Sequence, residues 1–347
     1  MDPGVSIILC CHNSERLLPE TLAALAAQKF DRPVDFEVVV VDNGSSDQTS
    51  KVAAASWPPQ AGARLRIVFE ERIGLSHARM RGIQEAKHEI LSFVDDDNRV
   101  CDSWVRRVAG IMALHPEVGA CGGRNLPACD AELPRWFHAA SYSYAVGEQG
   151  ASAGDVTESR GYLWGAGLTL RREALDRLIR GGFDSRLIGR RGAELSSGED
   201  TELCFALRLS GWRLWYDPEL QLKHYLPEHR LSWAYARRLN AGFGQASVHL
   251  DPYEIALGPP VSPFRRTWLW RTAATLKQLC RHFRKLSPFG PGLMEGDAEV
   301  LEIERIIGRL RELFRARKSY RRSVAEVARA AWRDLSPPGI SNSQYRI

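Results

Sequence analysis

Short apolar runs separated by stretches of helical spacing constrain the fold of this chain more than any other feature. Val5–Cys11 and residues 36–41 are nearly continuous apolar runs, which is typical of strands buried on both faces. Residues 65–69 and 89–94 read as two further strands. Between these runs, apolar residues recur at helical spacing from Pro19 onward and over residues 74–85, and they do so again over residues 103–114. Strands that alternate with helices predict an α/β fold with a mostly parallel, doubly wound sheet.

The second half of the chain has a mixed pattern. Residues 125–160 are rich in Pro, Ala, Gly and Ser, which predicts a loop-rich insertion. The last hundred residues are expected to be helical, and Pro337-Pro338 would stop the last helix. Strands are expected at 162–170, 214–216 and 220–224, and helices at 172–179 and from Gly198 to Gly211. We therefore expect three parts, at residues 1–125, 126–230 and 231–347.

Charge is distributed unevenly along the 347 residues. Residues 261–347 hold 18 Lys and Arg against 8 Asp and Glu, whereas residues 1–260 hold 29 against 34. Within 261–290, basic and apolar residues alternate. Two interpretations stay open: a helix that packs on the rest of the protein and keeps a solvated basic face, or an amphipathic helix that lies on an anionic membrane leaflet. Nucleic-acid binding is not expected, because no recognised motif occurs and acidic residues interrupt the later basic run.

The overall composition is that of a globular protein, since 44% of the residues are hydrophobic and 26% are charged. The chain has no run of 18 apolar residues and no signal-peptide pattern. Its seven cysteines lack the spacing of a disulfide framework. We therefore expect a cytoplasmic protein with reduced thiols.

Acidic residues follow two of the expected strands. Asp42 ends the run at 36–41, and Asp95, Asp96 and Asp97 follow the run at 89–94. Because the carboxyl ends of parallel strands lie at one edge of a sheet, these two turns should share one cleft. Adjacent carboxylates repel one another unless a cation is present, and Mg²⁺ or Mn²⁺ prefers such oxygen ligands. The alternative is a solvated acidic turn with Asp102 as a nearby helix cap, and Asp42 either binds a ligand or caps its own turn.

No glycine-rich phosphate loop is present. The turn after the first strand is His12-Asn13-Ser14-Glu15-Arg16, and neither G-x-G-x-x-G after a strand nor G-x-x-x-x-G-K-[ST] occurs. Nicotinamide and P-loop chemistry are therefore not expected. A phosphorylated ligand in this fold would need a metal in place of the missing loop.

Four further residues carry two interpretations each. Arg79 either contacts a nucleotide or is an exposed surface arginine. Glu199 and Asp200 open a helix, where they either cap it or supply a general base that deprotonates an acceptor hydroxyl. His224 ends an expected strand and is either structural or a ligand for Mn²⁺.

Six segments together resemble family 2 glycosyltransferases of the GT-A fold. They span residues 5–227 and are, in order, SIILCCHNSERLLPETL, VVVVDNGSSDQT, ERIGLSHARMRGI, ILSFVDDDN, WGAGLTLRREAL and GEDTELCFALRLSGWRLWYDPELQLKHYLP. The DDDN ending and the GWxxWYxPxxxxxH segment are similar to bacterial exopolysaccharide enzymes of the hormogonium-polysaccharide type. The chain departs from the family at His12, where an aromatic residue is usual, and at Met80, where Asn is common.

The resemblance implies a role for each matching position. Asp97, Asp95 and His224 would hold Mn²⁺ or Mg²⁺. Asp200 would be the catalytic base, with Glu199 beside it orienting a hydroxyl. Residues 1–125 would form the nucleotide-sugar-binding half of the GT-A domain, 126–230 the acceptor-binding and catalytic half, and 231–347 a basic helical extension. Nucleotide-sugar contacts would come from His12, Asn13, Glu15, Asp42, Arg79, Asp95, Asp96, Trp164, Gly165 and Ala166.

The function that the resemblance implies is an inverting, metal-dependent glycosyltransferase. It would move a sugar from a nucleotide sugar, expected to be a UDP-sugar, to a hydroxyl of a glycan or lipid-linked acceptor in polysaccharide biosynthesis. The transfer would take place in the cytoplasm or at the inner face of a bacterial membrane. Two alternatives stay open: a retaining transferase or nucleotidyltransferase on a similar sheet, and a catalytically inert protein that binds nucleotide sugars.

Overall fold

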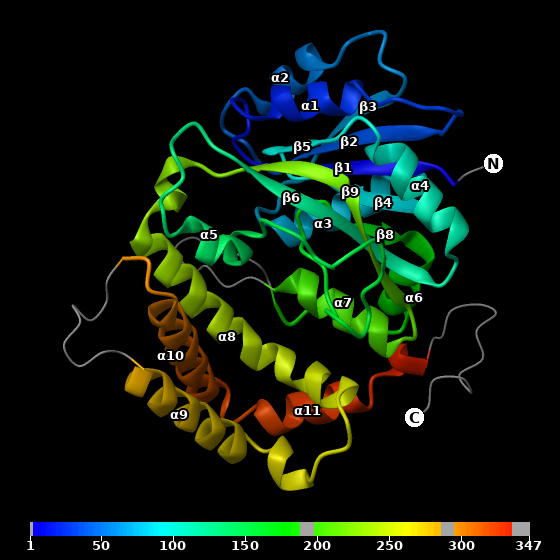
Figure 1. Cartoon of the computed structure of the whole chain (residues 1–347). Coiled ribbons are helices and arrows are strands. Elements are labelled where there is room, and N and C mark those ends of the chain that lie inside the picture. The colour runs from blue at the N-terminus through cyan, green and yellow to red at the C-terminus, as the bar shows by residue number, and fades with distance from the viewer. Residues whose placement is uncertain (1–2, 188–197, 286–294, 335–347) are drawn as a thin grey trace.

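The computed structural model describes residues 3–187, 198–285 and 295–334 (Figure 1). Its centre is a nine-stranded sheet with the order β3-β2-β1-β4-β8-β6-β9-β5, in which β7 pairs with β9. The expected parallel strands are confirmed at one end of the sheet. They are β1 (Val5–Cys11), β2 (Phe36–Asp42), β3 (Arg64–Phe69) and β4 (Ile90–Phe93).

The other end of the sheet is mixed, as expected for the second half of the chain. β8 (Thr169–Arg171) is antiparallel to β4 and to β6 (Val118–Ala128). β6 runs parallel to the long strand β9 (Arg213–Tyr225). β9 in turn pairs antiparallel with β5 (Asn98–Val100) and β7 (Gly154–Asp155).

Helices cover both faces of the sheet, which is the doubly wound arrangement. One core contains Ile7 and Val38, and it is covered by α1 (Leu18–Ala26), α2 (Thr49–Ser56) and α4 (Trp104–Leu114). The other core contains Ile8 and Val39, and it is covered by α3 (Leu75–Glu85), α6 (Arg172–Arg180) and α7 (Glu199–Leu209). Alternate residues of β1 and β2 thus face opposite layers, because side chains alternate along a strand. The short helix α5 (Phe137–Ala140) precedes the 3-10 turn Ser141–Tyr144.

The C-terminal part of the described chain is helical, as expected. It contains α8 (Trp233–Leu257), α9 (Trp268–Lys285), α10 (Ala298–Ala316) and α11 (Tyr320–Ala328), and α10 lies between α8 and α9 (Figure 1). α8 and α10 meet at glycines: a Cβ at Gly244 would lie 1.8 Å from the carbonyl oxygen of Arg305. In the described residues, no helix combines the length and hydropathy needed to cross a membrane. The expected stop at Pro337-Pro338 lies outside the described residues.

Several expectations about the second half are corrected by the structure. Of residues 162–170, only Thr169 and Leu170 belong to a strand, because the backbone at Gly167 has a φ of 78° and turns away from the sheet. The strands expected at 214–216 and 220–224 form one strand, β9. Its register with β6 shifts at a bulge that contains Pro218. β6 was not expected, because its three glycines and one proline weaken its strand propensity. Only its last four residues fall within the region 125–160 that was expected to be rich in loops.

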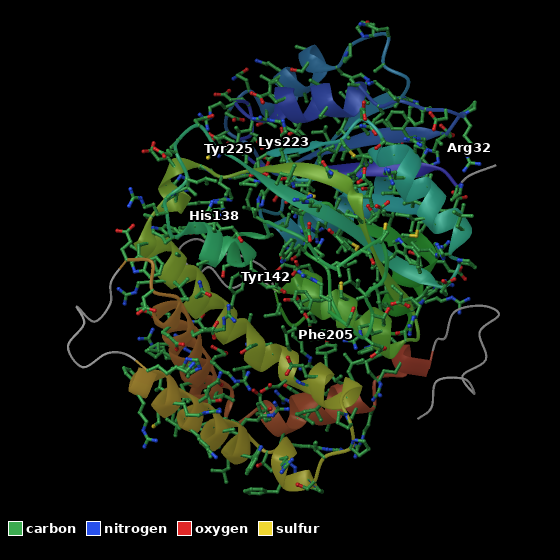
Figure 2. All side chains as sticks on the ribbon, viewed as in Figure 1. Arg32, His138, Tyr142, Phe205, Lys223 and Tyr225 are labelled. Carbon is green, nitrogen blue, oxygen red and sulfur yellow. The ribbon has the colours of Figure 1, made fainter. Side chains whose placement is uncertain are left out.

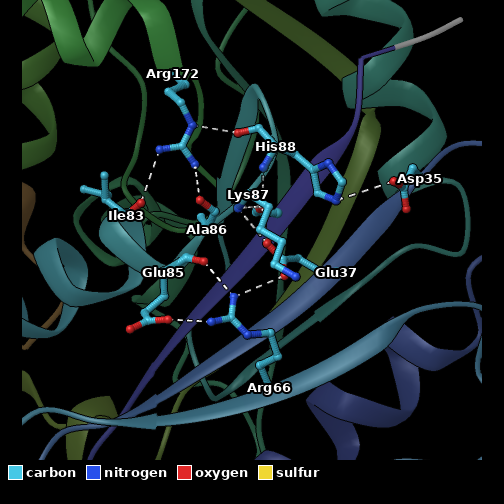
Figure 3. Close-up of polar contacts among 10 residues, drawn as sticks. Asp35, Glu37, Arg66, Ile83, Glu85, Ala86, Lys87, His88 and Arg172 are labelled. Atoms are coloured by element: carbon cyan, nitrogen blue, oxygen red, sulfur yellow. Dashed lines mark hydrogen bonds and ion pairs between the residues drawn. The ribbon is translucent and has the colours of Figure 1, made fainter.

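An arginine fixes the end of α3, the helix that carries Arg79. The guanidinium of Arg172 donates to the carbonyl oxygens of Ile83, Ala86 and His88 at 3.2, 2.8 and 2.8 Å (Figure 3). These are carbonyls at and just beyond the last turn of α3, which have no partner inside the helix. Arg172 thereby joins α6 to the segment between α3 and β4.

Replacing Arg172 with Ala should lower the free energy of unfolding by about 2–4 kcal/mol, because three carbonyl groups lose a charged donor. Urea denaturation measures the change. The control is Arg177→Ala in the same helix, which removes the i,i+4 ion pair with Glu173 and should cost at most about 0.5 kcal/mol. Equal losses for the two variants would contradict the role assigned to Arg172.

Candidate active site

The turns after β1 and β2 are interlocked by polar contacts. Asn13 has a left-handed backbone (φ 56°), and its Oδ1 accepts from the N–H of Ser46 at 2.8 Å. Glu15 accepts from the main-chain N–H of Gln48 at 2.9 Å. The Nδ1 atom of His12 lies 2.8 Å from the main-chain carbonyl oxygen of Asn43, in the turn after β2. Three residues predicted to contact the nucleotide therefore lie together at one corner of the sheet edge.

Asp42 uses both carboxylate oxygens, one in its own turn and one on the helix α2 that follows the turn. Oδ1 accepts from the N–H of Ser45 at 3.0 Å, and Oδ2 accepts from the hydroxyl of Ser50 at 2.5 Å. The next residue, Asn43, accepts from the N–H of Gly74 at 2.8 Å and so joins this turn to the start of α3. The capping contacts expected under one interpretation of Asp42 are present, and its contact with a nucleotide stays a prediction.

Asp95, Asp96 and Asp97 follow β4 at the same edge of the sheet, with β1 between β2 and β4. The hydroxyl of Ser14 donates to the carboxylate of Asp96. Burial and the neighbouring carboxylates of Asp97 and Asp95 raise the pKa of Asp96 to about 7, although the Ser14 hydrogen bond opposes this rise. The carboxylates of this turn therefore repel one another at close range.

His224 is brought next to the acidic turn by β9. β5 begins at Asn98, directly after Asp97, and Asn98 lies opposite His224 in the antiparallel pair. The N–H of Tyr225 donates to the carbonyl oxygen of Asp97 at 3.3 Å. In the part of the chain that the structure describes, no group of three or more His, Cys, Asp and Glu side chains is arranged to hold a metal ion. The three-residue metal site therefore stays a prediction.

Arg79 is a half-buried cation between two acidic segments, and not the exposed surface arginine of the alternative interpretation. Its guanidinium lies 3.6 Å from the carboxylate of Glu199, and 5.8 Å from the ring centre of Phe93 at the end of β4. Burial acts to lower the pKa of Arg79, but the charges of Glu199 and Asp95 outweigh burial and hold that pKa above its ordinary value. Arg79 therefore links the start of α7 to the end of β4.

Asp200 is held in one orientation by two main-chain donors. Its Oδ2 accepts from the N–H of Gly165 at 2.6 Å, and its Oδ1 accepts from the N–H of Thr201 at 2.8 Å. Burial and the charge of Glu199 raise the pKa of Asp200 to about 6. An oriented carboxylate with a pKa nearer neutrality has the properties of a general base.

The segment from Trp164 to Ala166 lies against this carboxylate. A Cβ at Gly165 would lie 3.2 Å from Oδ2 of Asp200 and 3.5 Å from Nη2 of Arg79, so a side chain there would press on both groups. Trp164 is buried, and its main-chain N–H donates at 2.7 Å to the side-chain oxygen of Gln149. Gln149 was not singled out in the sequence, where it lies in the region read as a loop-rich insertion.

A pocket of about 480 Å³ adjoins the same segment, and Tyr142, Gln149, Arg160 and Tyr162 contribute to its lining. The guanidinium carbon of Arg160 lies 4.6 Å from the ring centre of Trp164, 4.9 Å from that of Tyr162 and 5.0 Å from that of Tyr142. Tyr142 lies below the sheet, in the region between α5 and α7 (Figure 2). This cluster was not predicted from the sequence, although four aromatic residues fall between positions 142 and 164.

The predicted site residues thus form three groups at one edge of the sheet, of which the acidic turn with His224 is one. His12, Asn13, Glu15 and Asp42 belong to the interlocked turns after β1 and β2. Arg79, Gly165, Glu199 and Asp200 lie together, although they come from three distant segments. Ser14 connects the first group to the acidic turn by its contact with Asp96.

A protein-family model matches this chain. The model is described as Glycosyl transferase family 2 and covers residues 6–179, which is half of the chain. The glucosyl-dolichyl phosphate glucuronosyltransferase of Haloferax volcanii is 23% identical over 254 residues, covering 71% of this chain and 77% of that protein. The succinoglycan biosynthesis protein ExoM of Rhizobium meliloti is 26% identical over 254 residues, covering 69% and 72%.

Two solved structures have a similar fold. S. aureus TarS 1-349 in complex with UDP has a TM-score of 0.50 and 17% identity, covering 92% of this chain and 91% of that one. The mannosyltransferase PcManGT of Pyrobaculum calidifontis, in complex with GDP-Man and Mn²⁺, has a TM-score of 0.51 and 20% identity, covering 96% and 88%. By its family match, and by the fold that it shares with these transferases, the chain belongs to glycosyl transferase family 2 and is a glycosyltransferase of the GT-A fold.

Proposed function

We propose that the protein is an inverting, divalent-metal-dependent glycosyltransferase. It transfers a sugar from a nucleotide sugar, a UDP-sugar, to a hydroxyl of a glycan or lipid-linked acceptor in polysaccharide biosynthesis. The observation that carries the proposal is the carboxylate of Asp200, which two main-chain N–H groups orient beside the Arg79–Glu199 pair. No serine or cysteine nucleophile is required, because the acceptor oxygen itself attacks the donor sugar.

The donor and the pathway are supported by the relatives. TarS was crystallised with UDP and PcManGT with GDP-Man, and ExoM is named for succinoglycan biosynthesis. The nucleotide sugar binds at the edge formed by the turns after β1, β2 and β4, where ligands of doubly wound sheets collect. Residues 1–125 act as the donor-binding half, residues 126–230 as the acceptor and catalytic half, and residues 231–347 as an extension. The seven free thiols are in keeping with the reducing cytoplasm as the place of work.

The metal is assigned to the acidic turn because its donor atoms fit a hard divalent cation. Asp95 and Asp97 supply carboxylate oxygens, and His224 supplies an imidazole from the strand that pairs with β5. Such a cation takes one or two carboxylates together with substrate phosphates, so the protein itself need not complete the ligand shell. When bound, Mn²⁺ or Mg²⁺ stabilises the negative charge that develops on the departing nucleotide.

The side chains of the protein remove the proton and fix the geometry of the transfer. Asp200 removes the proton from the acceptor hydroxyl as that oxygen forms a bond to the anomeric carbon, and the bond to the nucleotide phosphate breaks on the opposite side. One displacement inverts the configuration of the sugar. Gly165 and Thr201 keep the carboxylate aimed, and Glu199 orients a sugar hydroxyl. The aromatic pocket beside Trp164 is the acceptor side of the site.

The pH dependence of kcat/KM should show the ionisation of Asp200. The pKa of Asp200 is raised to about 6, and the base works in its ionised form, so kcat/KM should rise about tenfold per pH unit below 6 and level off above it. Glu199→Gln removes a negative neighbour that raises this pKa, so the rise should move to lower pH. A profile that is flat from pH 5 to 8, or a rise that moves to higher pH in Glu199→Gln, would contradict the assignment.

Proton NMR of the glycoside product tests the proposed transfer directly. The anomeric coupling of the product, compared with that of the donor, should show inversion, because one displacement at the anomeric carbon is proposed. A product with retained configuration would exclude direct attack by an acceptor that Asp200 has deprotonated. A product that carries the nucleotide would instead indicate a nucleotidyltransferase.

A further inference from the structure

Five apolar side chains of α9 are exposed along one side of the helix. Leu269, Ala273, Leu276, Cys280 and Phe283 recur at spacings of four and three residues and form one stripe, named here the outer stripe. Leu269 is 64% exposed and Phe283 is 51% exposed. A surface helix normally turns such a stripe toward the core.

The inward face of α9 combines one apolar contact, Trp268 packed against Leu313 of α10, with polar groups. Thr272 and Thr275 are buried. Arg271 lies 3.3 Å from the fully buried carboxylate of Asp251 in α8, and Arg309 of α10 lies 2.8 Å from the same carboxylate. Rotating α9 to bury the outer stripe would take Arg271 away from this buried charge, which would then keep Arg309 and lose one of its two cations. The outward direction of the stripe is therefore built into the packing of α8, α9 and α10.

Positive charge borders the outer stripe. α9 contains five Lys and Arg residues and no Asp or Glu. Lys277, Arg281 and Arg284 are exposed, and each follows a stripe residue by one position, so they lie along one flank of the stripe. The preceding 3-10 turn, Pro263–Arg266, extends the surface with the exposed side chains of Phe264, Arg265 and Arg266. The guanidinium of Arg265 lies 5.4 Å from the ring centre of Trp270 at the start of α9.

The positive charge along the outer stripe favours an anionic partner for this surface. A second copy of the chain docked on the outer stripe would place the same cations against one another. An anionic bilayer instead accepts the apolar side chains below its headgroups and attracts the bordering cations. We propose that Pro263–Arg266 and α9 form a membrane-docking surface, which lies in the plane of an anionic lipid leaflet with the outer stripe inserted. This proposal does not depend on the sugar, the acceptor or the stereochemistry of the transfer.

Vesicle sedimentation of the full chain tests the proposal. The protein should sediment with vesicles of equal parts phosphatidylcholine and phosphatidylglycerol, and remain in solution with phosphatidylcholine alone. Added salt should weaken the binding, because the bordering charges are exposed. The double variant Leu276→Glu with Phe283→Glu should weaken binding at least about tenfold, because it replaces inserted apolar groups with anions.

The controls separate lipid binding from folding and from self-association. Leu114→Glu alters an exposed leucine at the end of α4 and should bind vesicles as the unaltered protein does. The double variant should keep its circular dichroism spectrum and its release of nucleotide from a soluble donor, since both residues are exposed and lie outside the candidate active site. Absence of binding to anionic vesicles, equal binding to neutral ones, or a dimer in solution that the double variant dissociates would each overturn the proposal.

Discussion

Asp200→Asn should abolish sugar transfer while leaving the binding of the nucleotide sugar intact. The amide keeps the size of the carboxylate and its place in α7, but it cannot take a proton from the acceptor. Loss of a general base lowers kcat by about 10²–10⁴-fold. Steady-state kinetics gives kcat, and calorimetric titration with the donor gives the dissociation constant, which should change less than about threefold.

Asp102→Asn is the matched control for this substitution. Asp102 is a partly exposed aspartate paired with Lys29 at 2.7 Å, and it lies outside the candidate active site. Its amide variant should retain full activity, because exposed ion pairs contribute little. An Asp200→Asn enzyme with undiminished kcat would show that another group removes the proton.

Asp97→Ala should remove metal-dependent activity by preventing productive binding of the cation. The Lewis-acid contribution of a bound divalent ion amounts to several kcal/mol, so kcat/KM should fall by at least about 10²-fold. The measurement is the electron paramagnetic resonance signal of free Mn²⁺, titrated with protein in the presence of the donor. Asp97→Ala should leave more Mn²⁺ free than the unaltered protein does.

Asp130→Ala serves as the control for the metal experiment. Asp130 accepts from the hydroxyl of Tyr225 at 2.5 Å and is otherwise exposed, so its loss removes a nearby acid without touching the acidic turn. Its Mn²⁺ titration should match that of the unaltered protein. Equal Mn²⁺ binding by Asp97→Ala and the unaltered protein would remove Asp97 from the metal site.

The fold of residues 1–125 was predictable from sequence because its local and tertiary signals agree. β-branched runs such as Val38–Val41 favour strands, and a buried parallel strand needs the same apolar residues on both faces. The position of the acidic residues after β2 and β4 was predictable for a related reason, since parallel neighbouring strands end at the same edge of a sheet. The second half was less predictable because β6 is rich in glycine: Gly123 leaves space for the carbonyl oxygen of Leu220, which a Cβ would approach to 1.7 Å.

Contacts between distant segments were not accessible from local patterns. Arg79 meets Glu199 and Asp200 meets Gly165 only after the sheet has formed, and nothing in the spacing of these residues indicates the pairs. Which face of α9 turns inward could not be predicted for a similar reason. Its alternation of basic and apolar residues is visible in the sequence, but the inward face is decided by the buried charge of Asp251 on another helix.

Nucleotide release from a panel of nucleotide sugars, with Mn²⁺ and then with excess EDTA, tests the central claim most directly. The claim is that the edge formed by the turns after β1, β2 and β4 binds the donor diphosphate together with a divalent cation. Release should occur with a UDP-sugar in the presence of Mn²⁺, should stop in EDTA and should return when Mn²⁺ is restored. Sugar transfer that continues undiminished in EDTA would contradict the account.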